Sequence, residues 1–170
     1  MKILKYAGIT VVALVISFFG LGLFVPSFDY ASVVTVNASP ENCWAALQDS
    51  SRMKNVMPGL VRITLKRGEH LKAGAEYEIV IRQDKIYIMQ ETLKEVRPPE
   101  WAAYELTNDV MTSVYHYQLI PKSSQTEIHN LYQVTGNNLV WKSILFLSKS
   151  YLQQASQLQL DMLKKEIESE

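Results

Sequence analysis

The chain has 170 residues, in which 17 lysines and arginines balance 17 aspartates and glutamates. This length fits one domain, and the lack of net charge argues against nucleic acid as a partner. With Cys43 as its one cysteine, the sequence excludes an intramolecular disulfide and a cysteine-cluster metal site.

The N-terminal segment is an uncharged apolar run from Ala7 to Val25. A helix rises about 1.5 Å per residue, so this run spans about 28 Å, close to the bilayer hydrocarbon core of about 30 Å. Lys2 and Lys5 precede the run, and lysine is enriched on the cytoplasmic side of membrane spans. The sequence therefore predicts a single-pass membrane protein that meets the bilayer through residues 7–25. Its N-terminus would be cytoplasmic and its domain extracytoplasmic, either periplasmic or extracellular.

A cleaved signal peptide is the alternative interpretation of this run. The apolar middle of a signal peptide usually has about 7 to 15 residues and is followed by a small-residue cleavage site. Here the run is longer, and the bulky residues FVP occupy the place of that site. We therefore expect a retained anchor over residues 1–26, a short linker over 27–31 and one domain over 32–170.

The domain is predicted to open with a strand and a helix. β-Branched residues alternate along residues 32–37, as in a strand with one buried face. Ser39, Pro40 and Glu41 then supply an N-cap, a proline at the first helical position and an acid near the positive helix end. We expect this helix over residues 40–49.

Six further strands are predicted after a second short helical turn at residues 53–57. In most of these runs apolar and polar residues alternate, and turn residues separate the runs. The predicted strands cover residues 61–66, 76–82, 85–96, 101–108, 112–120 and 126–135.

A long helix from Leu139 to about Ile167 is expected to close the chain. Its apolar residues recur every three or four positions, which predicts one continuous stripe along the helix. The residues of this stripe are Val140, Ile144, Leu147, Tyr151, Ala155, Leu158 and Met162. Residues 141–147 are apolar on nearly all sides, so they are expected either to pack under the sheet or to rest on the membrane surface.

This order of elements predicts an α+β fold, in which an antiparallel sheet of about six or seven strands curves around the long C-terminal helix. The stretches VVTVNASPENCWAALQD, VRPPEW and LQLDMLKKEIES occur in the order and at the separation seen in one superfamily. The chain resembles the START-like (SRPBCC), helix-grip superfamily, which includes the birch-pollen allergen and polyketide cyclase/dehydrase-like proteins. An apolar N-terminal anchor with a short proline-containing linker, as in FVPSFDY, is similar to a membrane-anchored branch of that superfamily. The segment SRMKNVMPGL, however, lacks the tryptophan-rich segment that many members carry after the first helix.

The resemblance implies an apolar cavity between sheet and helix that accepts lipids, sterols, polyketides or similar molecules. Inward-facing tyrosines suit either a cavity wall or a packed core. The residues expected to bind a hydrophobic ligand are Tyr77, Ile79, Ile81, Tyr115, Tyr117, Tyr132 and Tyr151.

No catalytic or metal site is expected, and no cofactor. His116 and His129 fall on neighbouring predicted strands, but zinc needs three or four ligands, so two surface histidines are the simpler interpretation. Glu91, Glu95 and Glu105 lie on strands, and no pattern marks any of them as buried or paired.

The leading hypothesis is a membrane-anchored domain that binds a small hydrophobic ligand, lipid-like or similar, without catalysis. An enzyme of the cyclase or hydrolase type that uses cavity tyrosines or glutamates is one alternative. A structural or partner-binding module of the cell envelope is the other.

Overall fold

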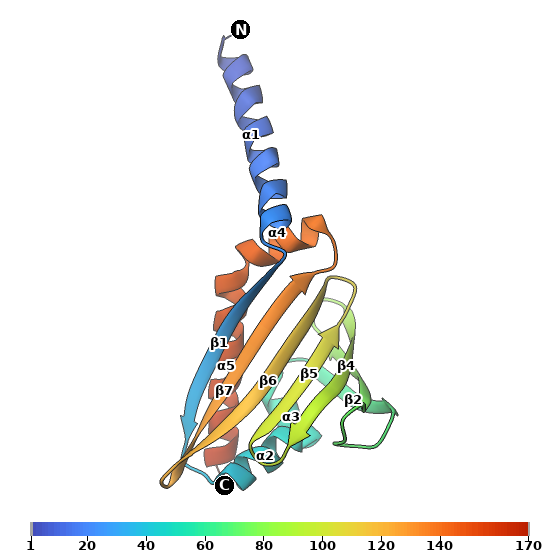
Figure 1. The fold of residues 1–170 in the computed structure, drawn as a ribbon, viewed down its shortest axis with the longest axis vertical. Helices are drawn as coiled ribbons and strands as arrows, with labels where there is room; N and C mark the ends of the chain where they lie inside the picture. The colour runs from blue at the N-terminus through green and yellow to red at the C-terminus, as the bar shows by residue number, and fades with distance from the viewer. Residues whose placement is uncertain (1, 170) are drawn as a thin grey trace.

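The computed structural model describes residues 2–169, and side chains from Tyr6 onward. Its helices and strands follow the predicted order closely (Figure 1). In chain order they are α1 (Lys2–Phe24), β1 (Ser27–Val36), α2 (Pro40–Gln48), α3 (Ser50–Val56), β2 (Leu60–Arg67), β3 (Glu76–Arg82), β4 (Ile86–Arg97), β5 (Trp101–Thr107), β6 (Met111–Lys122), β7 (Gln125–Gly136), α4 (Leu139–Leu147) and α5 (Lys149–Glu168).

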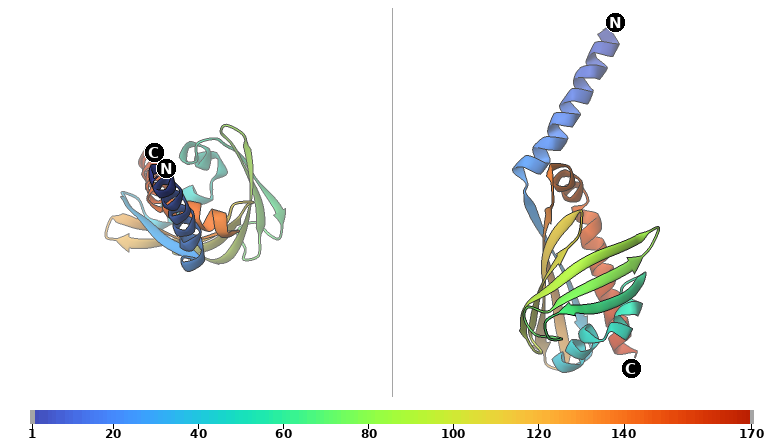
Figure 2. Two further views of the ribbon diagram at one scale, coloured as in Figure 1. Left: turned by 90° about the horizontal axis from the view of Figure 1, so that it is seen from above. Right: turned by 90° about the vertical axis from the view of Figure 1, so that its right-hand side faces the viewer.

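The sheet contains seven strands in the order β1-β7-β6-β5-β4-β3-β2, and every pair is antiparallel. The sheet curves, and the helices α2, α3 and α5 lie on its concave side (Figure 2). This arrangement confirms the predicted α+β helix-grip fold.

The segment expected to be a linker is part of the sheet. Residues 27–31 form the first half of β1 and pair with residues 131–135 of β7. Phe28 is buried there and packs with Val134 and Leu145. The linker prediction was wrong because β7 is long enough to extend the pairing of β1 back to Ser27, a partner that local sequence does not reveal.

The predicted C-terminal helix is broken at Ser148, which ends α4 and begins α5. Three residues of the predicted apolar stripe face solvent and not the core: Leu147, Tyr151 and Leu158 are exposed. The buried face of α5 consists of Ser156, Leu160, Leu163 and Ile167. Two apolar rows run along this sequence, and only the contacts of the folded chain select which row is buried.

Helix α5 lies along the edge strand β1 and protects it. The Gln157 side chain accepts from the Val33 amide at 3.2 Å and donates to the Val33 carbonyl at 3.0 Å, and Gln153 donates to the Ala31 carbonyl at 3.2 Å. Ser32 and Ser156 form a buried hydroxyl pair. These side chains replace the missing neighbouring strand. The main contacts of α5 are with β1, α3 and α2, so α5 itself covers the β1 side of the concave face.

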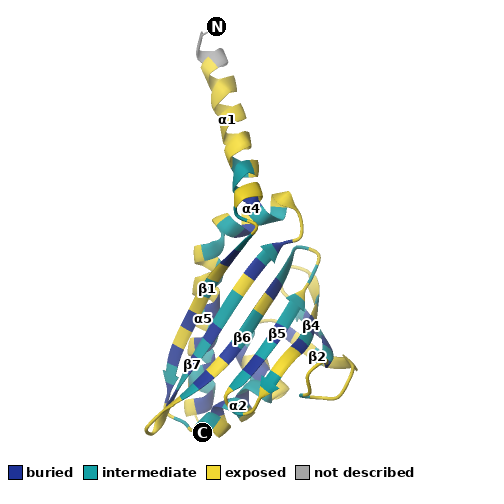
Figure 3. Cartoon of the chain, viewed as in Figure 1, coloured by how far each residue is buried: buried dark blue, intermediate teal, exposed yellow. Residues whose placement is uncertain are grey.

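Helix α1 projects from one end of the domain and is exposed along most of its length (Figure 3). The helical segment Tyr6–Phe24 is long and apolar enough to cross a membrane, and it is the one such segment among residues 2–169. The side chains of Lys2 and Lys5 lie outside the described part of the chain, so the predicted orientation stays a prediction.

Candidate functional site

A cavity of about 400 Å³ lies between the concave face of the sheet and helices α2, α3 and α5. Its wall is mostly apolar, with leucines, methionines and isoleucines from both the helices and the strands. The volume falls in the range of small-molecule pockets, roughly 300–1,000 Å³. The cavity exists because α5 runs along the sheet edge and does not fill the groove.

A row of tyrosines crosses the sheet on its concave side. Tyr104, Tyr115, Tyr132 and Tyr30 lie directly opposite one another on β5, β6, β7 and β1. Their rings stack at centroid distances of 5.1, 5.1 and 4.8 Å. Tyr117 meets both Tyr104 and Tyr115 edge to face. Cross-strand aromatic pairs stabilise a sheet, and here they also give the cavity a rigid aromatic wall.

Glu91 is the carboxyl group that lines this cavity. It lies on β4, is 9% exposed, and accepts a hydrogen bond from the Tyr115 hydroxyl. Burial raises the pKa of Glu91 from 4.5 to about 7, against the smaller opposing effect of the Tyr115 hydrogen bond. The group therefore exchanges a proton near neutral pH, where an ordinary glutamate is fully ionised.

The tyrosine hydroxyls are held in their neutral form. Burial raises the pKa of Tyr104 and of Tyr132 to about 12, and the pKa of Tyr115 rises well above 10 because of burial and then the nearby Glu91 carboxyl group. Asn130 donates to the Tyr132 hydroxyl at 3.1 Å. These phenols therefore stay protonated at neutral pH, where each can donate and accept a hydrogen bond.

A second polar contact lies at the β2–β3 side of the cavity. The Tyr77 hydroxyl accepts from the Leu71 amide at 3.0 Å and lies 3.1 Å from His70 Nδ1. His70, Leu71 and Tyr77 all line the cavity. The loop between β2 and β3 is thus fastened to the cavity wall by one tyrosine.

Five of the seven residues expected to face a ligand do line the cavity: Tyr77, Ile79, Tyr115, Tyr117 and Tyr132. Ile81 packs at the margin of the main core and does not line the cavity. The expectation for Tyr151 was wrong, since this side chain is 72% exposed on the outer face of α5. Ligand contact by the other residues remains a prediction.

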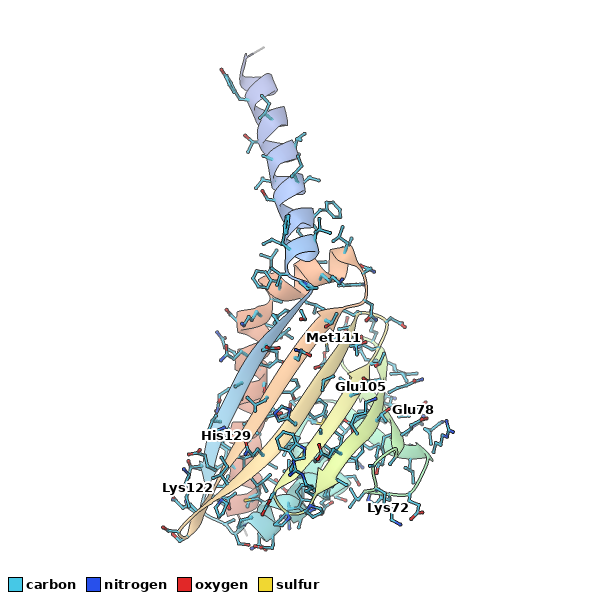
Figure 4. All side chains as sticks on the ribbon, in the orientation of Figure 1. Lys72, Glu78, Glu105, Met111, Lys122 and His129 are labelled. Carbon is cyan, nitrogen blue, oxygen red and sulfur yellow. The ribbon has the colours of Figure 1, made fainter. Side chains whose placement is uncertain are left out.

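Sequence reasoning missed Glu91, which is both buried and paired. The alternation of β4 offered a signal, because Glu91 shares a strand face with Met89 and Leu93. Glu105 forms an exposed ion pair with Lys94 at 3.0 Å, and Glu95 one with Arg97 at 3.1 Å. In Figure 4 Glu105 and Met111 are labelled on the neighbouring strands β5 and β6, with Met111 nearer the end of the sheet that carries α4.

The two strand histidines have different neighbours. The His116 ring packs against the Trp101 ring, with 4.3 Å between the ring centroids. His129 Nε2 lies 2.6 Å from Glu127 Oε1. His129 pairs in the sheet with Gln118, two residues from His116. Within residues 2–169 no group of three or more histidine, cysteine, aspartate or glutamate side chains is placed to hold a metal ion.

Comparison with known proteins finds one family that matches most of this chain. A family described as "Polyketide cyclase / dehydrase and lipid transport" matches residues 27–168, which is nearly the whole chain after α1. A search of curated proteins gives no match.

Solved structures share the fold at low sequence identity. Ara h 8.0201 superposes with a TM-score of 0.68 at 11% identity, covering 85% of this chain and 99% of its own. A conserved protein of Geobacillus kaustophilus gives 0.69 at 13%, covering 84% and 96%. An aromatase/cyclase from a Streptomyces species gives 0.67 at 12%, covering 84% and 94%.

Proposed function

This chain belongs to the polyketide cyclase/dehydrase and lipid-transport family, and we propose that it is a membrane-anchored domain that binds one small hydrophobic molecule in its cavity. The observation that carries this proposal is the cavity of about 400 Å³, whose wall is mostly apolar and carries a few polar groups, among them tyrosine hydroxyls and a buried carboxyl group. An apolar pocket with a few convergent polar groups is the usual form of a small-molecule site.

The wall chemistry indicates the kind of ligand. Leucine, isoleucine and methionine side chains fit an apolar chain or ring, and the stacked tyrosines offer flat aromatic faces. Protonated Glu91 donates a hydrogen bond, whereas its ionised form only accepts. We therefore expect a mainly apolar molecule with one hydrogen-bonding group, such as a hydroxyl or carbonyl, directed toward Glu91.

The anchor supports the same proposal. Helix α1 is exposed on nearly every side over Tyr6–Phe24, and a helix apolar all round fits a lipid environment. On this proposal the two leading lysines keep the N-terminus in the cytoplasm, and the domain lies on the opposite side of the membrane.

Native mass spectrometry of the full-length chain, extracted in mild detergent from its own membrane, tests the proposal. We expect one bound small molecule per chain, and we expect Ile63→Trp to displace it because Ile63 lines the cavity. Thr64→Trp is the matched control, since Thr64 is the next residue of β2 and is exposed. Wild-type protein that carries no small molecule, or equal occupancy in both variants, would contradict the proposal.

An enzyme is the second candidate, and the contact between Glu91 and Tyr115 favours it. A carboxyl group with a pKa near 7 suits general acid–base catalysis at neutral pH. On this alternative, Glu91→Gln abolishes turnover of the bound molecule while ligand occupancy is retained. A bound molecule recovered chemically unchanged after prolonged incubation with wild-type protein would count against catalysis.

A further inference from the structure

Helix α4 packs against the last turns of α1. Ser143 Oγ donates a hydrogen bond to the Phe18 carbonyl at 2.6 Å, and a Cβ at Gly22 would collide with the Leu139 carbonyl and the Ser143 hydroxyl. Glycine at position 22 is therefore what lets the two helices approach so closely.

The depth of this contact follows from the length of α1. Phe18 precedes the end of α1 at Phe24 by about 9 Å, at about 1.5 Å per residue. If Tyr6–Phe24 spans the hydrocarbon core, the contact with α4 begins inside the outer edge of that core. Helix α4 therefore lies at the outer boundary of the hydrocarbon and not in the water outside the membrane.

The outer face of α4 has the composition expected at that depth. Val140, Ile144 and Leu147 are 43%, 37% and 63% exposed and recur every three or four residues. Lys142 is the single charged residue in the helix. An apolar face accompanied by lysine is typical of a helix that lies in the membrane interface.

A notch of about 480 Å³ opens at the same end of the domain. It exists because β4 extends beyond β5: Gln90 pairs with Thr107, the last residue of β5, so residues 86–89 have no β5 partner. The other walls of the notch are Ile81 and Gln83 at the end of β3, the turn at residues 108–110, and Trp141 of α4. Strand β4 begins and β5 ends at the end of the domain from which α1 leaves (Figure 1).

One edge of the notch, formed by residues 86–88 of β4, is apolar and exposed. Ile86 and Ile88 are 57% and 58% exposed, and Tyr87 is 37% exposed. Lys85 and Asp109 are the two charged residues that line it. One positive and one negative charge beside apolar side chains fit the headgroup level of a bilayer.

The notch and the cavity share one wall residue. Met89 lines both, and it is partly buried. Methionine has three rotatable bonds and adapts to irregular space, so the notch and the cavity meet at an adaptable side chain.

We propose that α4 and the β3–β4 hairpin dock the domain on the bilayer, and that the cavity fills from the membrane through the notch beside Met89. This inference rests on the proposed function, because it assumes the anchor and the ligand. It narrows the ligand to molecules that reside in the bilayer and reach the cavity without crossing water. Continuity with α1 identifies the bilayer as the surface that covers α4 and the hairpin.

Membrane contact is tested on the full-length chain in phosphatidylcholine vesicles that contain brominated lipid. Single cysteines at Ile86→Cys and Leu147→Cys carry a fluorescent label, while the native Cys43 is fully buried. We expect the lipid to quench both labels. Ser124→Cys, in the β6–β7 turn at the far end of the sheet, should stay unquenched, and Val15→Cys in α1 should be quenched as a control for the anchor.

Entry through the notch is tested by kinetics. Emptied protein is reconstituted into vesicles that contain dodecanol, and occupancy is followed by native mass spectrometry. The double variant Ile86→Asp/Ile88→Asp should fill about tenfold more slowly, a barrier increase of about 1.4 kcal/mol, yet reach wild-type occupancy at equilibrium. The pair Val33→Asp/Val114→Asp is the matched control, because both valines are exposed strand residues outside the notch.

The outcomes separate the two proposals. Quenching at position 15 but not at 86 or 147, together with wild-type filling of the double aspartate variant, would overturn docking and lateral entry while leaving the anchored binder intact. No quenching at position 15, or no dodecanol bound by any variant at equilibrium, would overturn the proposed function itself.

Discussion

The buried carboxyl group of Glu91 makes the stability of the domain depend on pH in an unusual direction. Its pKa is about 7 in the folded chain and 4.5 without burial. Because the folded-state pKa is raised, the stabilising contribution is fully present below pH 4.5 and is lost as the pH rises toward 7. At about 1.4 kcal/mol per pKa unit, the loss is roughly 3 kcal/mol.

The variant Glu91→Gln removes this titration and keeps a similar shape beside Tyr115. We expect the free energy of unfolding of wild type, minus that of the variant, to fall by roughly 3 kcal/mol between pH 4.5 and pH 8. The slope should be about 1.4 kcal/mol per pH unit through the middle of this range. Urea denaturation of the full-length chain in detergent, at half-unit pH steps, measures it.

The matched control is Glu95→Gln on the same strand. Glu95 lies outside the cavity in an exposed pair with Arg97, and exposed pairs contribute at most about 1 kcal/mol. Its difference from wild type should therefore change little with pH. A flat or rising profile for Glu91→Gln would refute the reasoning, because it would mean that Glu91 is ionised in the folded domain.

Three other expectations concern the fold. Leu163→Ala removes a fully buried side chain of α5 and should lower the free energy of unfolding by about 2–5 kcal/mol; a loss below 1 kcal/mol in urea titration would contradict the packing. Gln157→Ala removes both bonds to the backbone of Val33 and should cost about 1–2 kcal/mol, with faster hydrogen exchange in β1. Gly22→Val should speed hydrogen exchange in α4, whereas Gly20→Val, which meets open space, should not; equal exchange in the two variants would argue against the contact between α1 and α4.

Signals confined to a few neighbouring residues were enough for most elements. The helix at Pro40 begins where Ser39 was expected to cap it, and the Asn42 amide does donate to the Ser39 hydroxyl at 3.3 Å. Alternation placed Tyr115 and Tyr117 on one face of β6, and both line the cavity. Strands and helix caps can be predicted from sequence because the residues that determine them lie within a few positions of one another along the chain.

The errors share a different cause. The face of α5 that is buried, the extension of β1 to Ser27 and the burial of Glu91 all depend on partners far away in the sequence. An apolar row on a helix specifies that something covers it, but not which element does so.

The sequence by itself thus determined the α+β fold, the order of its helices and strands along the chain, and the apolar N-terminal helix. The family resemblance implied a cavity, but no residue pattern did, because the cavity depends on α5 lying along β1 and not across the sheet. The tertiary structure alone decided the proton affinity of Glu91, since desolvation is set by everything that surrounds a group and not by its neighbours along the chain.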